Sequence, residues 1–231
     1  MPYPGPVPAD AELVLDLPDD APQERMGVLY RRLADLVAAD AAPRVFAGDC
    51  VAVIGVLAGL QRRGLDPTLI FFDAHGDFHT WETTASGFLG GMPLAMLTGR
   101  GEQTILQAAG QEPLPDDRVV LVGARDLDPG EDEAVAVSGV RTVEVSGVSD
   151  LDLDGPLYVH LDVDVVDPED LPAVNYPAPE GPSLDTTLAA MEYLAGTGRV
   201  VAFSVSSWNP AYPRAEEAAA ATRRLAAPFA G

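Results

Sequence analysis

The sequence contains no lysine, so all 14 of its basic residues are arginines, set against 36 acidic residues and a net charge of −22. Without lysine there is no Walker-type phosphate-binding lysine, and no Schiff base can form with pyridoxal phosphate or an aldol substrate. The acidity also disfavours nucleic acid and anionic membranes, whose binding depends on basic side chains. A small cationic substrate suits this charge, although acidity can also serve solubility alone.

Cysteine is almost absent as well, because Cys50 is the only one and no disulfide can form within the chain. A reducing cytoplasm is therefore the expected location. The first residues have neither the basic nor the apolar region of a signal peptide, and no run approaches the ~18 apolar residues of a membrane span. These absences predict a cytoplasmic protein without nucleic-acid or membrane partners.

Hydrophobic residues make up 47% of the 231 positions, enough for one α/β domain over residues 1–231. Continuous apolar runs, typical of buried parallel strands, take turns with helical periods. We therefore predict a three-layer αβα sandwich with a mainly parallel, doubly wound sheet, behind a short irregular N-terminal segment, 1–22. The expected strands cover residues 12–17 (the weakest), 45–47, 68–72, 119–123, 142–145, 157–161 and 200–205. The expected helices cover residues 23–39, 51–63, 92–98, 131–138, 184–195 and 214–225.

The most informative motif follows the apolar run 68–72, where Asp73, His75 and Asp77 occupy alternating positions. Side chains at alternating positions of an extended segment point the same way. Carboxylate and imidazole groups together suit Mn²⁺, Fe²⁺ or Zn²⁺. The motif therefore predicts ligands for a divalent cation.

A second motif of the same kind follows the run 157–161, which leads into Asp162 and Asp164. Ligands of a doubly wound sheet bind outside the carboxyl ends of its strands, so both motifs are expected to meet there. Carboxylates clustered in one pocket repel one another unless a cation neutralises them. Together the motifs predict a site for one or two metal ions.

Two other interpretations of these aspartates remain open. An aspartate after a strand also serves as an ordinary helix cap or a solvated loop residue. Metal–nucleotide transferases use an Asp-x-Asp motif, but that reading employs only Asp162 and Asp164 and leaves the first motif without a role. It also lacks a lysine for the phosphates.

Four motifs taken together resemble the ureohydrolase family of arginases, agmatinases and formiminoglutamases. They are the runs 73–77 (Asp-Ala-His-Gly-Asp), 83–93 (Thr-Thr-Ala-Ser-Gly-Phe-Leu-Gly-Gly-Met-Pro), 123–128 (Gly-Ala-Arg-Asp-Leu-Asp) and 162–168 (Asp-Val-Asp-Val-Val-Asp-Pro). Their order and spacing match the family over roughly residues 45–225. Phe78, the runs 82–84 and 89–92 and above all Cys50 are most similar to the branch that hydrolyses Nω-hydroxy-L-arginine, in which a cysteine replaces a metal-binding histidine.

The resemblance implies a centre for two manganese ions, with other divalent metals as alternatives. The implied ligands are Asp73, His75, Asp77, Asp162 and Asp164, with Cys50 at the place of the missing histidine. A thiolate is softer than imidazole and must first lose a proton, so unequal occupancy of the two sites is expected. Cys50 can otherwise be read as a small buried residue at a helix start.

The resemblance also implies a metal-dependent hydrolase of the C–N bond of a linear amidine or guanidine. Asp77 would be both a metal ligand and the group that accepts a proton from the attacking water. Ser86 and His79 would face a substrate carboxylate, and Asp128 an ammonium group, although His79 can also be read as a surface loop residue. Family members commonly form trimers or hexamers, which implies a homo-oligomer.

Two further positions depart from the family pattern. Gly90 stands where the family has a histidine assigned to proton shuttling, and Ser207 stands where relatives keep a carboxylate near the guanidinium. A guanidinium prefers a planar bidentate acceptor, which a serine hydroxyl cannot offer. Together with Cys50, these positions keep a second interpretation open, in which a catalytically impaired member of the fold binds metal or a partner without turnover.

Overall fold

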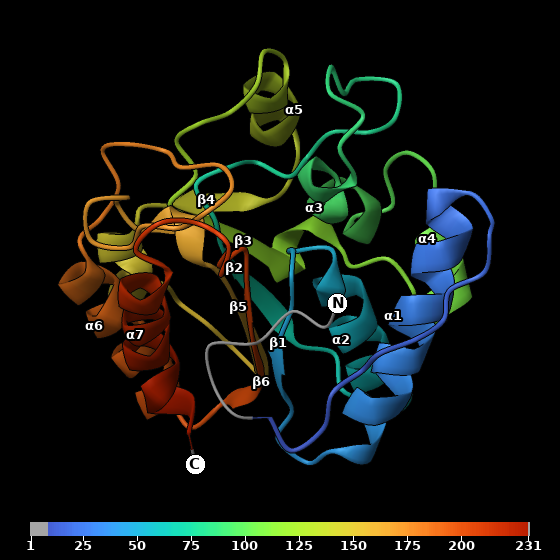
Figure 1. The fold of residues 1–231 in the computed structure, drawn as a ribbon, viewed down its shortest axis with the longest axis horizontal. Coiled ribbons are helices and arrows are strands. Elements are labelled where there is room, and N and C mark those ends of the chain that lie inside the picture. Colours follow the sequence, from blue (N-terminus) through green and yellow to red (C-terminus); the bar gives the residue numbers. More distant parts are fainter. Residues whose placement is uncertain (1–8, 231) are drawn as a thin grey trace.

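The computed structural model describes residues 9–230, so the first eight residues of the segment 1–22 lie outside the described range. The described residues form a six-stranded parallel sheet in the order β1-β6-β5-β2-β3-β4, with helices on both faces (Figure 1). The strands are β1 (Arg44–Phe46), β2 (Thr68–Phe72), β3 (Val119–Val122), β4 (Arg141–Val143), β5 (Leu157–Asp162) and β6 (Val200–Ser206). The helices are α1 (Pro22–Ala39), α2 (Ala52–Arg62), α3 (Pro93–Leu97), α4 (Thr104–Ala109), α5 (Glu131–Val137), α6 (Leu184–Gly196) and α7 (Ala215–Ala226).

Two hydrophobic cores lie on opposite faces of the sheet, because successive strand side chains point to opposite sides. Leu69 and Phe71 of β2 join the core that includes residues of α1, α2, α3 and α4. Ile70 and Phe72 join the core with α6 and α7. In Figure 1 these two groups of helices flank the sheet on either side. The predicted three-layer αβα sandwich with a parallel sheet is therefore confirmed.

Helices α1 and α2 approach each other closely because α2 has a glycine, Gly59, where they meet. A Cβ atom at Gly59 would lie 2.6 Å from Val37 Cβ and 2.8 Å from the Ala34 carbonyl oxygen. Helix α2 is buried over nine of its residues, from Ala52 to Leu60. Its first turn is therefore held rigidly, and this packing also places Cys50, two residues before the helix begins.

The structure differs from the expected elements in two places. Residues 12–17 form no strand, although Leu13, Leu15 and Leu17 are half-buried while the residues between them are exposed. That alternation reports side-chain burial and says nothing of whether a neighbouring strand is there to pair. Helix α4 was not expected, because six residues are too short to show a helical period.

The one-domain assignment over residues 1–231 stays a prediction. Among the described residues, no helix has the length and apolarity needed to cross a bilayer.

Candidate metal centre

The predicted ligands gather at the carboxyl ends of two neighbouring strands. β2 and β5 pair in parallel with Phe72 beside Leu161. Asp73 follows β2 directly, and Asp162 is the last residue of β5, so their carboxylates leave adjacent strands at the same edge of the sheet. The expected meeting of the two motifs at this edge is therefore found.

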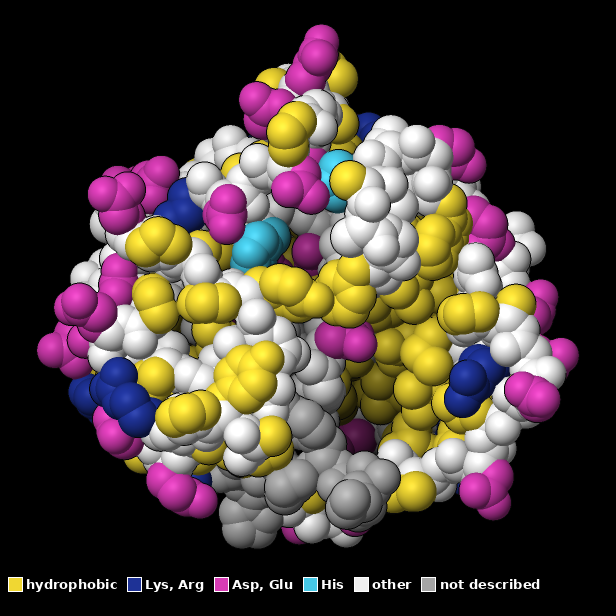
Figure 2. Space-filling view, turned by 45° about the horizontal axis from the view of Figure 1, so that its top comes forward, with side chains coloured by type: hydrophobic (Ala, Val, Ile, Leu, Met, Phe, Trp, Pro, Cys, Tyr) yellow, Lys and Arg dark blue, Asp and Glu magenta, His cyan; other side chains and the backbone are white. Residues whose placement is uncertain are grey.

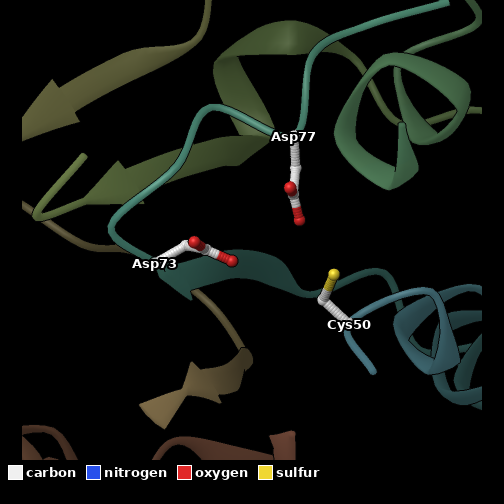
Figure 3. A group of neighbouring side chains, drawn as sticks. All are labelled: Cys50, Asp73 and Asp77. Atoms are coloured by element: carbon white, nitrogen blue, oxygen red, sulfur yellow. The ribbon is translucent and has the colours of Figure 1, made fainter. Parts of the chain in front are cut away.

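A first group consists of Cys50, Asp73 and Asp77, whose ligand atoms all lie within 4.8 Å of one another. They come from two segments, the turn before α2 and the loop after β2, and point toward one another (Figure 3). Asp77 adopts the left-handed region with φ 51°, which is uncommon outside glycine. Its carbonyl oxygen accepts the amides of Leu94 and Ala95 at 3.0 and 3.3 Å, and these bonds hold the turn in place.

A second group consists of Asp73, His75 and Asp164, with Asp73 common to both groups. His75 Nδ1 lies 3.1 Å from Asp73 Oδ1 and 3.4 Å from Asp164 Oδ2. Burial alone would lower the pKa of His75, but its hydrogen bonds and attraction to Asp164 and Asp73 raise it to about 12. Without a bound cation, the two buried carboxylates therefore favour the imidazolium form of His75.

The remaining charge of the cluster is not balanced by side chains. Burial and repulsion from neighbouring carboxylates raise the pKa of Asp73 and of Asp164 to about 6, and raise those of Asp77 and Asp162 well above the usual range. Burial also raises the pKa of Cys50, whose thiol donates to the Gly90 carbonyl oxygen at 3.2 Å. Nearby cations favour ionised carboxylates and thiolates, so the cluster has the electrostatics of a cation site.

One atom in particular shows that the residues fit a divalent cation. Asp77 Oδ2 is fully buried and has no hydrogen-bond partner among the described residues. A buried carboxylate oxygen without a partner is costly, whereas coordination to a metal satisfies it. The donor set of carboxylates, imidazole and a thiol belongs to first-row metals.

Asp162 is placed differently from the other predicted ligands. Its Oδ2 accepts hydrogen bonds from the hydroxyls of Ser206, at 2.9 Å, and of Ser207, while its Oδ1 accepts the Asp164 amide at 3.1 Å. It therefore lies beside the two groups without belonging to either. Its role as a metal ligand stays a prediction.

A buried chain of polar side chains, which the sequence analysis missed, leads to Asp162. Tyr158 Oη lies 2.6 Å from Ser204 Oγ, which lies 2.7 Å from His160 Nδ1. His160 Nε2 lies 3.3 Å from the Ser206 hydroxyl that contacts Asp162. Burial lowers the pKa of His160 to about 3, so the ring is neutral. Because the Ser206 hydroxyl donates to Asp162, its oxygen accepts from His160, which places the N–H of His160 on Nε2. The two serines at alternating positions of β6 were the available signal.

A second residue missed in the sequence is Glu131, at the start of α5. Its buried carboxylate accepts the amides of Phe78 at 2.8 Å and of Asp128 at 3.2 Å. It also fills the space beside Gly76, where a Cβ atom would lie 2.5 Å from Glu131 Cδ. Glu131 thereby ties the loop carrying Asp77 to the loop carrying Asp128. Nothing in the acidic run 131–133 distinguishes it from its neighbours.

The predicted substrate-binding residues are only partly brought together. His79 is nearly buried, with Nδ1 3.1 Å from Thr83 Oγ1 and Nε2 3.3 Å from Asp128 Oδ2. Ser86 is exposed in a separate turn, where its hydroxyl accepts the Phe88 amide at 3.2 Å. The pairing of His79 with Asp128 removes its reading as a plain surface histidine. The binding roles of His79, Ser86 and Asp128 stay predictions.

Comparison with known proteins matches residues 9–230 of the chain to the model of the arginase family. The arginase of Bacillus subtilis strain 168 is 33% identical over 183 residues, which are 73% of this chain and 62% of that protein. The N(omega)-hydroxy-L-arginine amidinohydrolase of Streptomyces lavendulae is 34% identical over 186 residues, 78% of this chain and 66% of that protein. The matched region thus spans less than two thirds of the length of these relatives.

Solved structures show the same likeness. The crystal structure of arginase from Bacillus cereus aligns with a TM-score of 0.83 at 28% identity, covering 91% of this chain and 79% of that one. The arginase of Bacillus caldovelox aligns with a TM-score of 0.80 at 29% identity, covering 96% of this chain and 82% of that one. The resemblance inferred from the four motifs is therefore confirmed.

Proposed function

Because this chain belongs to the arginase family, we propose that it hydrolyses the C–N bond of a guanidine or amidine with divalent cations, Mn²⁺ first among them, as cofactor. The observation that carries the proposal is the pair of ligand groups sharing Asp73 at the carboxyl edge of the sheet. The unpaired oxygen of Asp77 points to the same conclusion. The two named relatives act on arginine-type substrates, which supports a guanidino group as the reacting part.

The side chains divide the work by their positions. The cations would be held by the six predicted ligands, which are Cys50, Asp73, His75, Asp77, Asp162 and Asp164. A bound divalent cation supplies Lewis-acid polarisation and lowers the pKa of water toward neutrality. Asp77 offers a buried oxygen without a protein partner, the acceptor that a water needs in order to lose a proton. For a guanidine, addition of one water and cleavage of one C–N bond gives urea and an ammonium product.

A specific observation also favours the second interpretation, a member of the fold that binds metal without turnover. Ser207 lies in the left-handed region with φ 73°, and its hydroxyl donates to Asp162. It therefore offers the substrate no carboxylate and is committed to a predicted metal ligand. Metal binding alone does not distinguish this interpretation from hydrolysis.

The test is an Asp77→Asn variant compared with the parent, each loaded with Mn²⁺. Metal content and urea release from a panel of guanidines are measured together. We expect urea release from the parent and a loss of about 10²–10⁴-fold in the variant, the usual contribution of a general base. The control is Asp117→Asn, an exposed aspartate in the turn before β3, at the opposite edge of the sheet. Bound metal with no urea from any guanidine would establish the non-catalytic interpretation instead.

A further inference from the structure

Two exposed aromatic rings lie beside the metal centre, on loops far apart in the sequence. Phe88 is 42% exposed and Tyr176 is 52% exposed, and their ring centroids are 5.2 Å apart at 42°. Tyr176 also meets His75 edge-on, with centroids 6.3 Å apart. Figure 2 shows hydrophobic side chains beside a surface histidine, next to a small hollow that contains acidic atoms. We call Phe88 and Tyr176 the aromatic pair.

The ring of Phe88 occupies the space that a side chain at position 90 would fill, because that residue is Gly90. A Cβ atom there would lie 2.3 Å from Phe88 Cε1 and 2.5 Å from Cζ. The ring therefore takes the space that any larger residue at position 90 would need. The Gly90 carbonyl oxygen also accepts a hydrogen bond from the Cys50 thiol. Gly90 therefore lies between the Phe88 ring and the first ligand group.

The basic groups beside the centre are already engaged. The Arg125 guanidinium donates to five backbone carbonyls, those of Gly123, Asp164, Val165, Ala178 and Pro179. Both ring nitrogens of His79 have partners, Thr83 and Asp128. These two residues therefore have no donor left for a carboxylate without breaking a bond that the fold already makes.

Exposed carboxylates lie beside the two histidines of the site. The side chains of Asp126 and Asp128 are each 65% exposed, and both contact histidines of the site, at 3.9 Å for His75 and 3.3 Å for His79. They favour a cation and repel a carboxylate. Aromatic faces likewise attract cations and apolar groups.

We propose, building on the proposed function, that the substrate is a guanidine or amidine with an apolar tail and no carboxylate, bound along the aromatic pair. The planar cationic head lies at the metal centre, and the tail passes over Phe88 and Tyr176. This departs from the expectation that Ser86 and His79 receive the carboxylate of an amino-acid substrate. Phe88 and Tyr176 determine specificity and take no part in bond making.

The experiment uses the full chain loaded with Mn²⁺ and three probes: L-arginine, n-butylguanidine and 2-phenylethylguanidine. Dissociation constants are measured by calorimetry, and urea release is measured with the same probes. The two carboxylate-free guanidines are expected to bind about tenfold more tightly than L-arginine. Phe88→Asn and Tyr176→Ser are each expected to weaken 2-phenylethylguanidine about tenfold while changing L-arginine by less than about twofold.

The control is Tyr193→Ser, an exposed tyrosine on α6, which should leave all three dissociation constants unchanged. Thermal melting of each variant verifies folding. Equal or tighter binding of L-arginine by the parent overturns the proposal, as does indifference of the phenyl probe to both substitutions. A third outcome separates the two proposals. If no probe releases urea, the proposed hydrolysis is wrong. The proposed binding preference is still supported if the carboxylate-free guanidines bind more tightly and the substitutions in the aromatic pair weaken them.

Discussion

Among single residues, Cys50 is the softest group of the centre and the one whose role is easiest to test. Burial and nearby carboxylates raise the pKa of its thiol, so metal binding there must first remove a proton. Neutral imidazole needs no such step, and Cys50→His is expected to raise Mn²⁺ uptake toward two ions per chain. Elemental analysis after dialysis measures the stoichiometry, with Cys50→Ala as the comparison. An unchanged stoichiometry would make Cys50 a packing residue.

Ser206 joins His160 to Asp162, and its removal leaves buried groups on both sides without a partner. Ser206→Ala is expected to lower the free energy of unfolding by about 1–3 kcal/mol and to weaken Mn²⁺ binding, because Asp162 loses a donor. Chemical denaturation and a metal titration measure the two effects. Ser138→Ala is the matched control, since its hydroxyl also donates one hydrogen bond, to the Val135 carbonyl oxygen, but lies outside the centre. Metal affinity unaffected by Ser206→Ala would speak against this link.

At the scale of elements, Glu131 of α5 links the metal-binding loop to the loop carrying Asp128 through two hydrogen bonds. Glu131→Gln keeps one acceptor oxygen and Glu131→Ala keeps none, so we expect stability to fall in that order. Each amide left without a partner costs about 1–3 kcal/mol. Urea denaturation measures the series, and Glu133→Gln on the exposed side of the same helix should have no effect. Equal stability of all variants would show that the two loops are held by other contacts.

The elements of the layers were predictable because each leaves a pattern in the sequence. Buried parallel strands such as β2 and β5 appear as continuous apolar runs, and long helices such as α1 and α6 repeat their apolar positions. The segment 12–17 has a strand-like alternation without a strand, because pairing depends on a neighbour that local sequence cannot supply.

The candidate site was predictable to the extent that its residues follow strands directly. Asp73, His75 and Asp164 meet because β2 and β5 are adjacent. The aromatic pair was not foreseen, since the approach of residue 176 to residue 88 depends on how two long loops run in space. Glu131 was missed for the same reason, as its partners are amides of other loops.

For the whole molecule, the titration of the centre predicts how pH and metal act together. The pKa values of Asp73 and Asp164 are raised to about 6, above the ~3.9 of an unfolded aspartate, so the folded protein holds extra protons between these values. The raised pKa of His75 acts in the same direction above its unfolded value of ~6.5. These groups therefore contribute stability at low pH that is lost as pH rises.

Bound cations remove that loss, because they favour the ionised carboxylates and the neutral imidazole. The rise in melting temperature on adding Mn²⁺, relative to EDTA, is expected to grow between pH 5 and pH 8. Differential scanning fluorimetry in matched buffers measures it, and the difference cancels titrations elsewhere in the chain. A rise that is constant or shrinks over this range would contradict the assignment of these residues as ligands.

The position of His75 between Asp73 and Asp164 affects how the protein binds its metal. The His75 imidazolium offsets part of the negative charge of the second ligand group before any cation binds. Metal binding is then an exchange of ions, because a cation that binds His75 must displace the proton of the imidazolium. Calorimetry should show this as a heat of binding that changes with the protonation enthalpy of the buffer.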